Sequence, residues 1–550
     1  METTVKEKNP LSPATNRISR QSWNGTPQSI AFDEEAIHSA LINLSSEVYV
    51  VRVNDTVCLA VEGEITARQT SSEKNSADLL AVLPPLEIES LGDPEFNRCY
   101  GTKFAYYGGA MASGIASAAM VIALGKAGFM GSFGAAGLPP ARLEAAIQQV
   151  QAELPDGPYA FNLIHSPNEE ALERRAVELY LRYQIHTVEA SAFLDLTPHI
   201  VYYRAVGLSQ GNNGKIQINN RIIAKVSRRE VATKFMQPAP EKILSQLVQE
   251  GKITSQQAQW AQQVPMADDV CVEADSGGHT DNRPLVCLMP AMLALRDELQ
   301  EKYHYDEPVR VGAAGGISTP GSALAAFAMG AAFICTGTVN QACVESGASD
   351  HTKALLAKAS MADVMMAPSA DMFEMGVKVQ VLKTGTMFAM RASKLYELYT
   401  KYDSIEQIPG DEREKLEKQV FKRDMDDIWT ETVKFFTERD PEQIARANEN
   451  PKRKMALIFR WYLGLSSRWS ASGEKGRELD YQIWCGPAIG PFNDWTRATY
   501  LAEPQNRHVV DVARQIMTGS AYLARIQSLR NAGVQVSARL SSYYPRSAMI

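Results

Sequence analysis

The sequence predicts an α/β fold: a (β/α)8 TIM barrel with a small N-terminal β-containing domain and a helical C-terminal domain. The first observation behind this is an alternation of short apolar runs and helix-like segments across residues 101–360. The second is that these runs end in small residues, as in Ala314-Gly-Gly316 and Thr336-Gly-Thr338. Parallel strands that are buried on both faces and carry ligand loops at their carboxyl ends show this pattern.

Two segments precede the predicted barrel. Residues 1–30 are expected to be disordered, because Ser, Asn, Thr, Pro and Gln are spread there without periodicity. Residues 31–100 form the small N-terminal domain. Within it, Val48–Val53 and Val57–Val61 predict a β-hairpin that turns at Asn54-Asp55.

The barrel itself is predicted from eight apolar runs, most of them followed by a helix, and from a helical insertion at 239–263. The runs are Phe104–Tyr107, Gly128–Phe133, Tyr159–Ile164, Ile185–Glu189, Arg221–Val226, Val270–His279, Val309–Ile317 and Phe333–Val339. An open doubly wound sheet is the alternative. That fold would place G-x-G-x-x-G after its first strand, and Gly108-Gly109 does not fit the spacing.

Beyond the barrel, residues 361–402 are predicted to form an active-site or lid segment with few strand signals, and residues 403–550 a helical domain. The lid segment is rich in methionine, which would line a soft apolar channel or simply fill a core. These residues are Met361, Met365, Met366, Met372, Met375, Met387 and Met390. In the helical domain, Lys452-Arg453-Lys454 with Arg460 predicts either a docking patch for an acidic partner or a solvated helix face.

Composition excludes several classes of function. A net charge of −7 argues against a nucleic-acid binder. Seven scattered Cys without a metal-like pairing favour reduced thiols and a cytoplasmic location, and the N-terminus lacks a secretory signal. No metal site is expected. The uncharged windows 104–125 and 311–344 are rich in Gly, Ala, Ser and Thr, which favours buried strands and helices over a membrane span.

The ends of the last three barrel runs predict the chemistry. Gly315-Gly316 and Thr336-Gly337-Thr338 can offer backbone N–H groups and hydroxyls to a phosphate, although glycines also serve tight turns alone. His279 follows the sixth run and is titratable near neutral pH, unless it merely caps the next helix. We therefore expect a phosphorylated cofactor whose reactive end faces His279.

Longer motifs carry a resemblance to a known family. The barrel motifs resemble the FMN-dependent barrel superfamily of nitronate monooxygenases and flavin-dependent enoyl reductases, and the longer ones resemble the PfaD family. PfaD proteins are trans-acting enoyl reductases of polyunsaturated fatty acid and polyketide synthases. The longer motifs are Phe333–Glu345, Ala367–Phe373, Gly376–Lys383 and Asp480–Pro487. The resemblance covers about residues 90–530.

This resemblance implies roles for particular residues. It implies that His279 and Lys225 act in catalysis, and that small residues at the barrel mouth hold FMN. The implied FMN site comprises Gly109, Ala110, Met111, Asn162, Lys225, Gly277, Gly278, Gly315, Gly316, Thr336, Gly337 and Thr338. One departure is Ser276, where wider relatives often have Ala or Gly before the Gly-Gly-His motif.

Several polar residues keep two interpretations. Lys225 would stabilise an anionic reduced flavin, or extend its ammonium into water. Asn162 would meet a flavin edge or a neighbouring backbone group. Glu189 and Glu273 would support His279 or Lys225, or form a structural ion pair.

The implied function is a trans-acting, FMN-dependent enoyl reductase that uses NAD(P)H. Its substrates would be 2-enoyl thioesters on the acyl carrier protein of a fatty acid or polyketide synthase, and a homodimer is expected. Two alternatives remain: an FMN-dependent nitronate monooxygenase-type oxidase, and a flavin-bound docking scaffold without catalytic activity. The substrate's chain length and the choice between NADH and NADPH are not encoded in a recognisable pattern.

Overall fold

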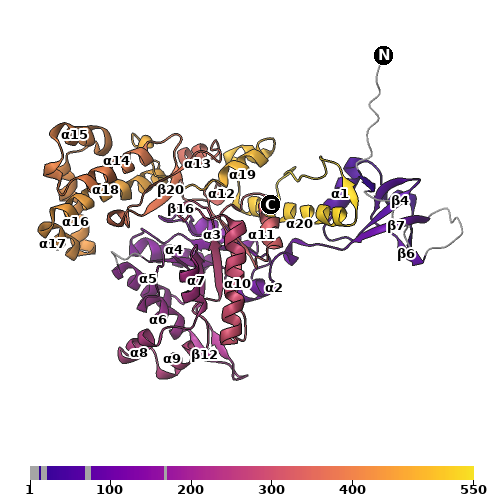
Figure 1. Cartoon of the computed structure of the whole chain (residues 1–550), viewed down its shortest axis with the longest axis horizontal. Helices are drawn as coiled ribbons and strands as arrows, with labels where there is room; N and C mark the ends of the chain where they lie inside the picture. Colours follow the sequence, from indigo (N-terminus) through magenta and orange to yellow (C-terminus); the bar gives the residue numbers. More distant parts are fainter. Residues whose placement is uncertain (1–10, 14–20, 68–75, 166–169, 550) are drawn as a thin grey trace, which may run out of the picture.

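A computed structural model describes residues 11–13, 21–67, 76–165 and 170–549. A parallel barrel occupies the centre of the molecule, with an N-terminal sheet on one side and a group of C-terminal helices on the other (Figure 1). The barrel confirms the predicted fold class.

Eight strands close the barrel in the order β8-β9-β10-β11-β14-β15-β17-β18, and every adjacent pair with a described register is parallel. All eight predicted strands are present. They are β8 (Tyr106–Gly108), β9 (Met130–Phe133), β10 (Ala160–Ile164), β11 (Thr187–Ser191), β14 (Arg221–Val226), β15 (Asp269–Glu273), β17 (Arg310–Ala314) and β18 (Ile334–Thr336). Most of their residues are buried, because side chains fill the interior and helices cover the outside.

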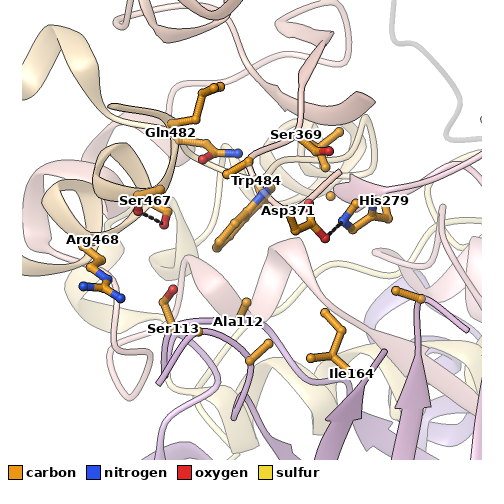
Figure 2. A pocket seen from close by; sticks show the side chains of 18 of the residues that line it. Ala112, Ser113, Ile164, His279, Ser369, Asp371, Ser467, Arg468, Gln482 and Trp484 are labelled. Atoms are coloured by element: carbon orange, nitrogen blue, oxygen red, sulfur yellow. Dashed lines mark hydrogen bonds and ion pairs between the residues drawn. The ribbon is translucent and has the colours of Figure 1, made fainter. Parts of the chain in front are cut away.

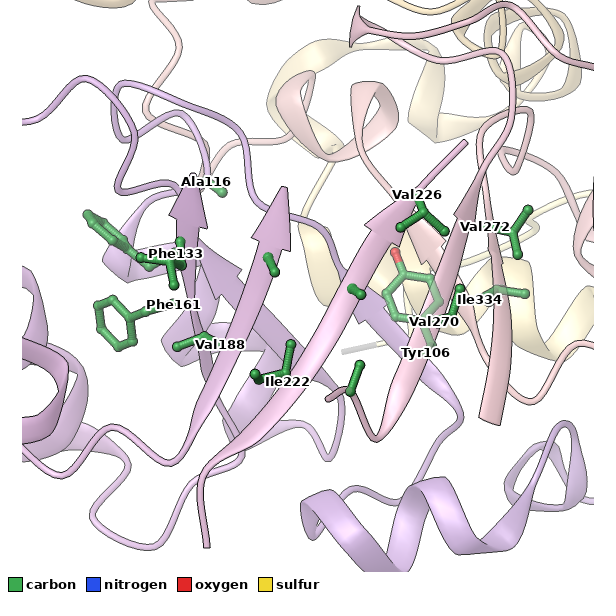
Figure 3. Close-up of a cluster of buried hydrophobic side chains, with 14 of the residues drawn as sticks. Tyr106, Ala116, Phe133, Phe161, Val188, Ile222, Val226, Val270, Val272 and Ile334 are labelled. Carbon is green, nitrogen blue, oxygen red and sulfur yellow. The ribbon is translucent and has the colours of Figure 1, made fainter. Parts of the chain in front are cut away.

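The helices that cover the barrel begin where the sequence supplies capping residues. Ser117, Thr197 and Thr319 accept backbone N–H groups at the starts of α3, α6 and α11. The covering helices are α3 (Ala118–Lys126), α4 (Pro140–Glu153), α5 (Glu170–Arg182), α6 (Pro198–Val206), α7 (Arg229–Met236), α10 (Leu285–Tyr303) and α11 (Pro320–Ala328). Outward-facing apolar side chains of the strands, such as Phe161 and Ile222, pack against them (Figure 3).

The predicted insertion at 239–263 contains two helices, α8 (Glu241–Gln249) and α9 (Ser255–Ala261). A hairpin that the sequence did not predict, β12 (Leu208–Gln210) and β13 (Ile216–Ile218), precedes β14. Among the described residues, no helix combines the length and the hydropathy that crossing a membrane requires.

The N-terminal domain is a six-stranded sheet in the order β3-β5-β4-β7-β2-β6. The predicted hairpin is present as β4 (Val48–Val53) and β5 (Thr56–Ala60), and its turn residues Asn54 and Asp55 have φ of 48° and 64°. The remaining strands are β2 (Gln21–Asn24), β3 (Ile30–Ala31), β6 (Glu64–Ala67) and β7 (Ser76–Leu83).

The prediction of disorder for residues 1–30 is wrong for the described part of this range, which is ordered. β2 pairs with β6 and β7, and it buries Trp23 to 1% exposure. β1 (Leu11–Pro13) pairs with the C-terminal strand β21 (Val534–Val536). These partners lie far away in the sequence, so local composition does not reveal them. Residues 1–10 and 14–20 lie outside the described residues.

The segment 361–402 contains two strands despite its weak strand signals. β19 (Val364–Pro368) and β20 (Lys378–Leu382) pair with each other, and β20 also pairs with β16 (Gly278–His279). The resulting three-stranded sheet joins the loop after β15 to the lid segment. α14 (Phe388–Lys401) follows.

The helices of residues 403–550 pack in two places. α16 (Met425–Arg439), α17 (Pro441–Glu449) and α18 (Pro451–Ser472) pack together with α14 beside the barrel mouth, with α15 (Gly410–Lys415) nearby. By contrast, α20 (Val509–Asn531) packs against α11 and α3, and its Tyr522 and Ile526 enter the core of the N-terminal domain. Amphipathic periodicity marks each helix but does not show which neighbour its apolar face meets.

Candidate active site

His279 lies at the mouth of the barrel on β16, opposite Val379 of β20. Its Nε2 lies 3.0 Å from Oδ2 of Asp371, in the loop between β19 and β20 (Figure 2). Both side chains are 32% exposed. The pair is therefore neither sealed in the core nor free in water, and both residues line a large cavity.

The His279–Asp371 contact changes the acidity of both groups. Burial lowers the pKa of His279, but the hydrogen bond and charge of Asp371 outweigh it and raise that pKa above its ordinary value of about 6.5. Burial likewise raises the pKa of Asp371, and the contact with His279 outweighs it and lowers that pKa. An ionised Asp371 therefore favours a protonated His279. When Nε2–H donates to Asp371, the second proton of the imidazolium is on Nδ1.

Lys225 lies between two carboxylates. Its Nζ is 3.3 Å from Oε1 of Glu189 and 3.4 Å from Oε1 of Glu273. The three residues come from β11, β14 and β15, which are consecutive in the barrel. The side chain of Lys225 is 15% exposed and that of Glu189 is fully buried. The ammonium therefore does not extend into water, and both glutamates are partners of Lys225.

Burial lowers the pKa of Lys225, but the charges of Glu273 and Glu189 outweigh it and raise that pKa well above the usual value. Burial raises the pKa of Glu273 despite the nearby ammonium. When all three are ionised, Lys225, Glu189 and Glu273 together carry a net charge of −1. The positive charge of Lys225 is therefore already balanced by protein carboxylates. Its ability to stabilise an additional anion is reduced accordingly.

Asn162 on β10 is held by neighbouring groups of β11. Its Nδ2 donates to the backbone carbonyl of Glu189 at 3.0 Å and to Oγ of Ser191 at 2.8 Å. This is the second of the two interpretations from the sequence, in which neighbouring protein groups satisfy the amide. The residue still lines the large cavity.

A small cavity of about 80 Å³ lies beside these charges, at the carboxyl ends of β15, β17 and β18. Most of the small residues predicted to hold a phosphorylated cofactor line it. They are Gly109, Ala110, Met111, Gly277, Gly315, Gly316, Gly337 and Thr338. Lys225 lines both cavities, whereas Gly278 lines the large one.

Thr336 is the predicted site residue that lines neither cavity. Its hydroxyl is buried and lies 2.5 Å from the hydroxyl of Tyr106, and its carbonyl accepts the N–H of Gly109 at 2.9 Å. The side chain of Thr336 therefore points into the protein, whereas its neighbours Cys335 and Gly337 line the small cavity.

Glycine occurs at positions 315 and 337 of the small cavity for different physical reasons. A Cβ on Gly315, whose φ is +77°, would lie 2.6 Å from the backbone of Ala274, so a side chain there is excluded by the neighbouring strand end. A Cβ on Gly337 would meet no atom within 4 Å, and its φ is −125°. The fold itself therefore admits a side chain at Gly337. The space beside this glycine is the cavity.

One polar group at the small cavity has no protein partner. Nε2 of Gln341 is buried and meets no hydrogen-bond acceptor among the residues that the structure describes. A buried donor without an acceptor is unfavourable, and in native proteins such a group commonly indicates a bound ligand or water. Gln341 lies in the motif Phe333–Glu345, but its sequence position alone gave no reason to assign it a role.

The segment around Trp484 borders the site, and Trp484 lines both cavities. Trp484 bridges to Val381 of β20, and its indole lies near His279 and Asp371 (Figure 2). The backbones of Gly277 and Gly486 approach so closely that a Cβ on either would lie within 3 Å of the other segment. The N–H of Gly486 also donates to Oγ1 of Thr338 at 3.1 Å. Asp371, Trp484 and Gly486 all lie in motifs used for the resemblance, where their roles were not assigned.

The large cavity has a volume of about 440 Å³ and extends from the barrel mouth to the C-terminal helices. Ala110, Asn162, Lys225 and His279 line it on the barrel side, and side chains of α16 and α18 line the opposite side. None of the seven methionines proposed as a channel lining, all of them described, contributes to either cavity. Four of them, Met361, Met375, Met387 and Met390, are exposed.

The basic residues proposed for docking are engaged with protein groups. Lys452 pairs with Asp403 at 2.9 Å, and Arg460 pairs with Glu374 at 3.3 Å. Lys454 lies over the ring of Trp429. Lys452 and Arg460 are thus paired with carboxylates, and Lys454 contacts an aromatic ring. Arg460 also lines the large cavity.

Three family models match the chain. The nitronate monooxygenase model matches residues 102–419, more than half of the chain. The model of the N-terminal domain of fatty acid synthase subunit PfaD matches residues 23–85. The model of the inserted helical domain of [acyl-carrier-protein] S-malonyltransferase matches residues 402–481, which contain the helices beside the barrel mouth.

The chain is similar to proteins named for polyunsaturated fatty acid synthesis and polyketide biosynthesis. One of the polyunsaturated fatty acid synthase polypeptides of a Thraustochytrium species is 48% identical over 92% of this chain, and polyketide biosynthesis protein PksE of Bacillus subtilis is 48% identical over 81%. The chain spans 34% and 58% of their respective lengths. The crystal structure of the enoyl reductase domain of MlnA, from the macrolactin cluster of Bacillus amyloliquefaciens, is 39% identical with a TM-score of 0.76. That match covers 80% of this chain and 100% of the other.

Proposed function

The chain belongs to the nitronate monooxygenase family of oxidoreductases and has the N-terminal domain of the PfaD proteins, and from this premise we propose that it is an FMN-dependent enoyl reductase. It would reduce 2-enoyl thioesters with NAD(P)H during polyunsaturated fatty acid or polyketide synthesis. The net reaction adds a hydride and a proton to the carbon–carbon double bond, and it oxidises NAD(P)H to NAD(P)⁺.

The observation that carries this proposal is the position of His279. Its Nε2 lies 3.0 Å from Oδ2 of Asp371, a contact that favours the protonated ring, and the residue lines a cavity whose lining is mostly apolar. Reduction of an enoyl thioester needs a proton donor next to the acyl group. A nitronate oxidation begins instead from an anion that is already deprotonated, and therefore has less use for a proton donor.

The residues of the small cavity fit the phosphate of FMN. Gly316 and Gly337 border open space, and Gln341 has a buried Nε2–H donor that a phosphate oxygen or a ribityl hydroxyl would accept. Thr338 lines the same cavity. The cavity also joins the barrel mouth through Ala110, Met111 and Lys225, which line both spaces.

When bound, FMN would supply the hydride chemistry that no protein side chain provides, carrying two electrons from NAD(P)H to the double bond. The protein supplies the proton and the geometry. His279 would donate its Nδ1 proton to the α carbon or hydrogen-bond the thioester oxygen, while Asp371 keeps the ring oriented through Nε2. Lys225 would hold the barrel mouth together electrostatically, because Glu189 also accepts the N–H of Ala110 at 2.8 Å.

The carrier of the substrate is proposed from the helices beside the cavity. They match the helical domain of a protein named for the acyl carrier protein, and they line the cavity opposite His279. A thioester on a carrier protein could thus reach the barrel mouth between two parts of the chain. A synthase partner follows from the synthases and polyketide proteins to which the chain is similar.

The test uses purified full-length protein loaded with FMN. We expect a flavin absorbance spectrum and anaerobic oxidation of NAD(P)H that depends on a crotonyl thioester. Protein that binds no added FMN would overturn the proposal. Turnover of nitronates that requires O₂, without reduction of enoyl thioesters, would favour the oxidase alternative. A flavoprotein that supports synthase activity equally well with His279→Ala would favour the docking scaffold.

A further inference from the structure

The large cavity continues well beyond the groups that would perform the reaction. On its far side, one face of α18 borders it through Leu457, Trp461, Gly464 and Arg468, which recur at intervals of three or four residues. Aromatic residues of α16, Phe435 and Phe436, complete this wall. Most of the surface that lines the cavity is apolar, although Glu431, Thr432, Arg460, Ser467 and Arg468 add polar side chains from the same two helices. Side chains of α16 and α18 therefore form one side of the large cavity.

Gly464 is unusual on this face. It is in the interior of a 22-residue helix, where glycine is less favourable than alanine. Nevertheless, a Cβ built on Gly464 would meet no atom within 4 Å. Close packing therefore does not require glycine here, and neither a turn nor a positive φ accounts for it. The absence of a side chain instead leaves space in the cavity.

We propose that Gly464 keeps open a subsite for the distal part of the acyl chain and thereby sets the length of acyl chain that the enzyme accepts. This inference rests on the proposed enoyl reductase function. The occupant is the acyl chain and not the pantetheine arm, because most of the surface that lines the cavity is apolar, with Phe435, Phe436 and Leu457 on this wall, whereas the two amide groups of the arm need polar partners along their whole path. An apolar chain, by contrast, gains free energy along this wall.

The test compares Gly464→Phe, Gly464→Ala and wild-type protein, all loaded with FMN. The substrates are four-carbon and twelve-carbon 2-enoyl thioesters of coenzyme A. For Gly464→Phe we expect the ratio of kcat/KM for the long substrate to that for the short one to fall at least about tenfold, since filling an apolar pocket discriminates on this scale. Gly464→Ala should change the ratio much less, because a methyl group fills little of the space.

A matched control is Gly410→Phe. Gly410 is exposed at the start of α15, and a Cβ there also meets nothing within 4 Å, but it does not line the cavity. This variant should keep the wild-type ratio. An equal loss for both substrates in Gly464→Phe, or no loss for either, would overturn the inference. Thermal melting and flavin absorbance of each variant show whether the protein is folded and loaded.

Binding of saturated acyl thioesters, measured by calorimetry, separates this inference from the proposed function. We expect wild-type protein to bind a twelve-carbon chain more tightly than a four-carbon chain, and Gly464→Phe to lose that preference. If wild-type protein shows the preference but reduces no enoyl thioester, the proposed function fails and the subsite stands. If it reduces enoyl thioesters but both proteins bind the two chains alike, the subsite fails and the function stands.

Discussion

His279 Nε2 lies 3.0 Å from Asp371 Oδ2, although the two residues are 92 positions apart in the chain. The contact joins the loop after the sixth barrel strand to the lid segment through the small sheet β16-β20-β19. Any movement of the lid would therefore change both the orientation and the acidity of the imidazole. We infer that the lid is part of the proton-donating machinery.

Replacing Asp371 by Asn should weaken the proton-donating form of His279. Because Asp371 holds the pKa of His279 above its ordinary value, its loss lowers that pKa. Protonated His279 is present below its pKa and disappears as pH rises through it. We expect kcat/KM of wild-type enzyme to fall on the alkaline side, and this limb to move to lower pH in Asp371→Asn. At pH 8 the variant should lose about tenfold, against about 100-fold or more for His279→Gln.

The pH profile distinguishes this role from simple structural support. A general loss of stability would lower kcat/KM at every pH without moving the limb. Asp297→Asn is a suitable control, because Asp297 is an exposed residue of α10 that pairs with Arg296. If Asp371→Asn keeps the wild-type limb while its activity falls, Asp371 does not set the acidity of His279.

The barrel could be predicted from the sequence because each of its strands has a recognisable local pattern. Each strand is a short apolar run that ends in small residues, and β17 (Arg310–Ala314) is buried along its whole length. Neighbouring strands also follow one another along the chain, so the carboxyl ends had to meet at one mouth. The sequence alone therefore predicts that Gly315, Gly337 and Lys225 lie near one another.

The rest of the site depends on contacts that no local pattern records. Asp371 reaches His279 only because β20 pairs with a two-residue strand, β16, which is too short to give a signal. Lys225 was one of the two partners expected for Glu189 and Glu273, and the order β11-β14-β15 in the closed barrel decides for it by placing its ammonium between both carboxylates. Thr336 looked like a ligand in sequence, and the end of β18 turns its hydroxyl toward Tyr106.

Replacing Lys225 by Met should destabilise the fold. The change leaves Glu189, which is fully buried, and Glu273, which is 16% exposed, without their shared cation. Removing one partner of a buried ion pair costs about 3–5 kcal/mol. Chemical unfolding of the variant, compared with that of wild-type protein at pH 7, measures this change.

The pH dependence of that loss follows from the same charges. Burial already raises the pKa of Glu273, and without the charge of Lys225 that pKa rises further above its value in the unfolded chain. The penalty therefore grows as pH increases and shrinks as pH falls toward the unfolded value. We expect a smaller loss at pH 5 than at pH 8. The double variant Lys225→Met/Glu189→Gln should recover part of the stability. A loss that is independent of pH would show that packing of the lysine stem, rather than charge, dominates.

Replacing Gly337 by Leu should prevent FMN binding without disturbing the apoprotein. The backbone of Gly337 has a negative φ and the site of its Cβ is open, so the fold accommodates a side chain that fills the small cavity. We expect the Kd for FMN, measured by quenching of flavin fluorescence, to rise at least about tenfold. Gly321→Leu is the control, because its Cβ is equally unobstructed but it lies outside both cavities.

Gly315→Ala, unlike Gly337→Leu, should destabilise the apoprotein itself. Its φ of +77° and the backbone of Ala274 at 2.6 Å mean that the added methyl group strains the barrel even without a ligand. We expect a lower melting temperature of the apoprotein, whereas Gly337→Leu should keep that of wild type. If both variants melt like wild type and bind FMN normally, neither glycine borders the phosphate site.

Gln341→Leu gives the last test, because the sign of its effect on stability differs between the free and the loaded protein. Nε2 of Gln341 is buried without an acceptor in the described part of the chain, so an apolar side chain of similar size relieves an unsatisfied donor. The apoprotein should therefore melt at the same or a higher temperature. With FMN present, the variant loses a hydrogen bond, and the Kd for FMN should rise about five- to tenfold. Melting curves with and without saturating FMN measure both effects in one experiment. A variant that is destabilised without FMN yet binds FMN like wild type would show that Gln341 serves the fold and makes no contact with the cofactor.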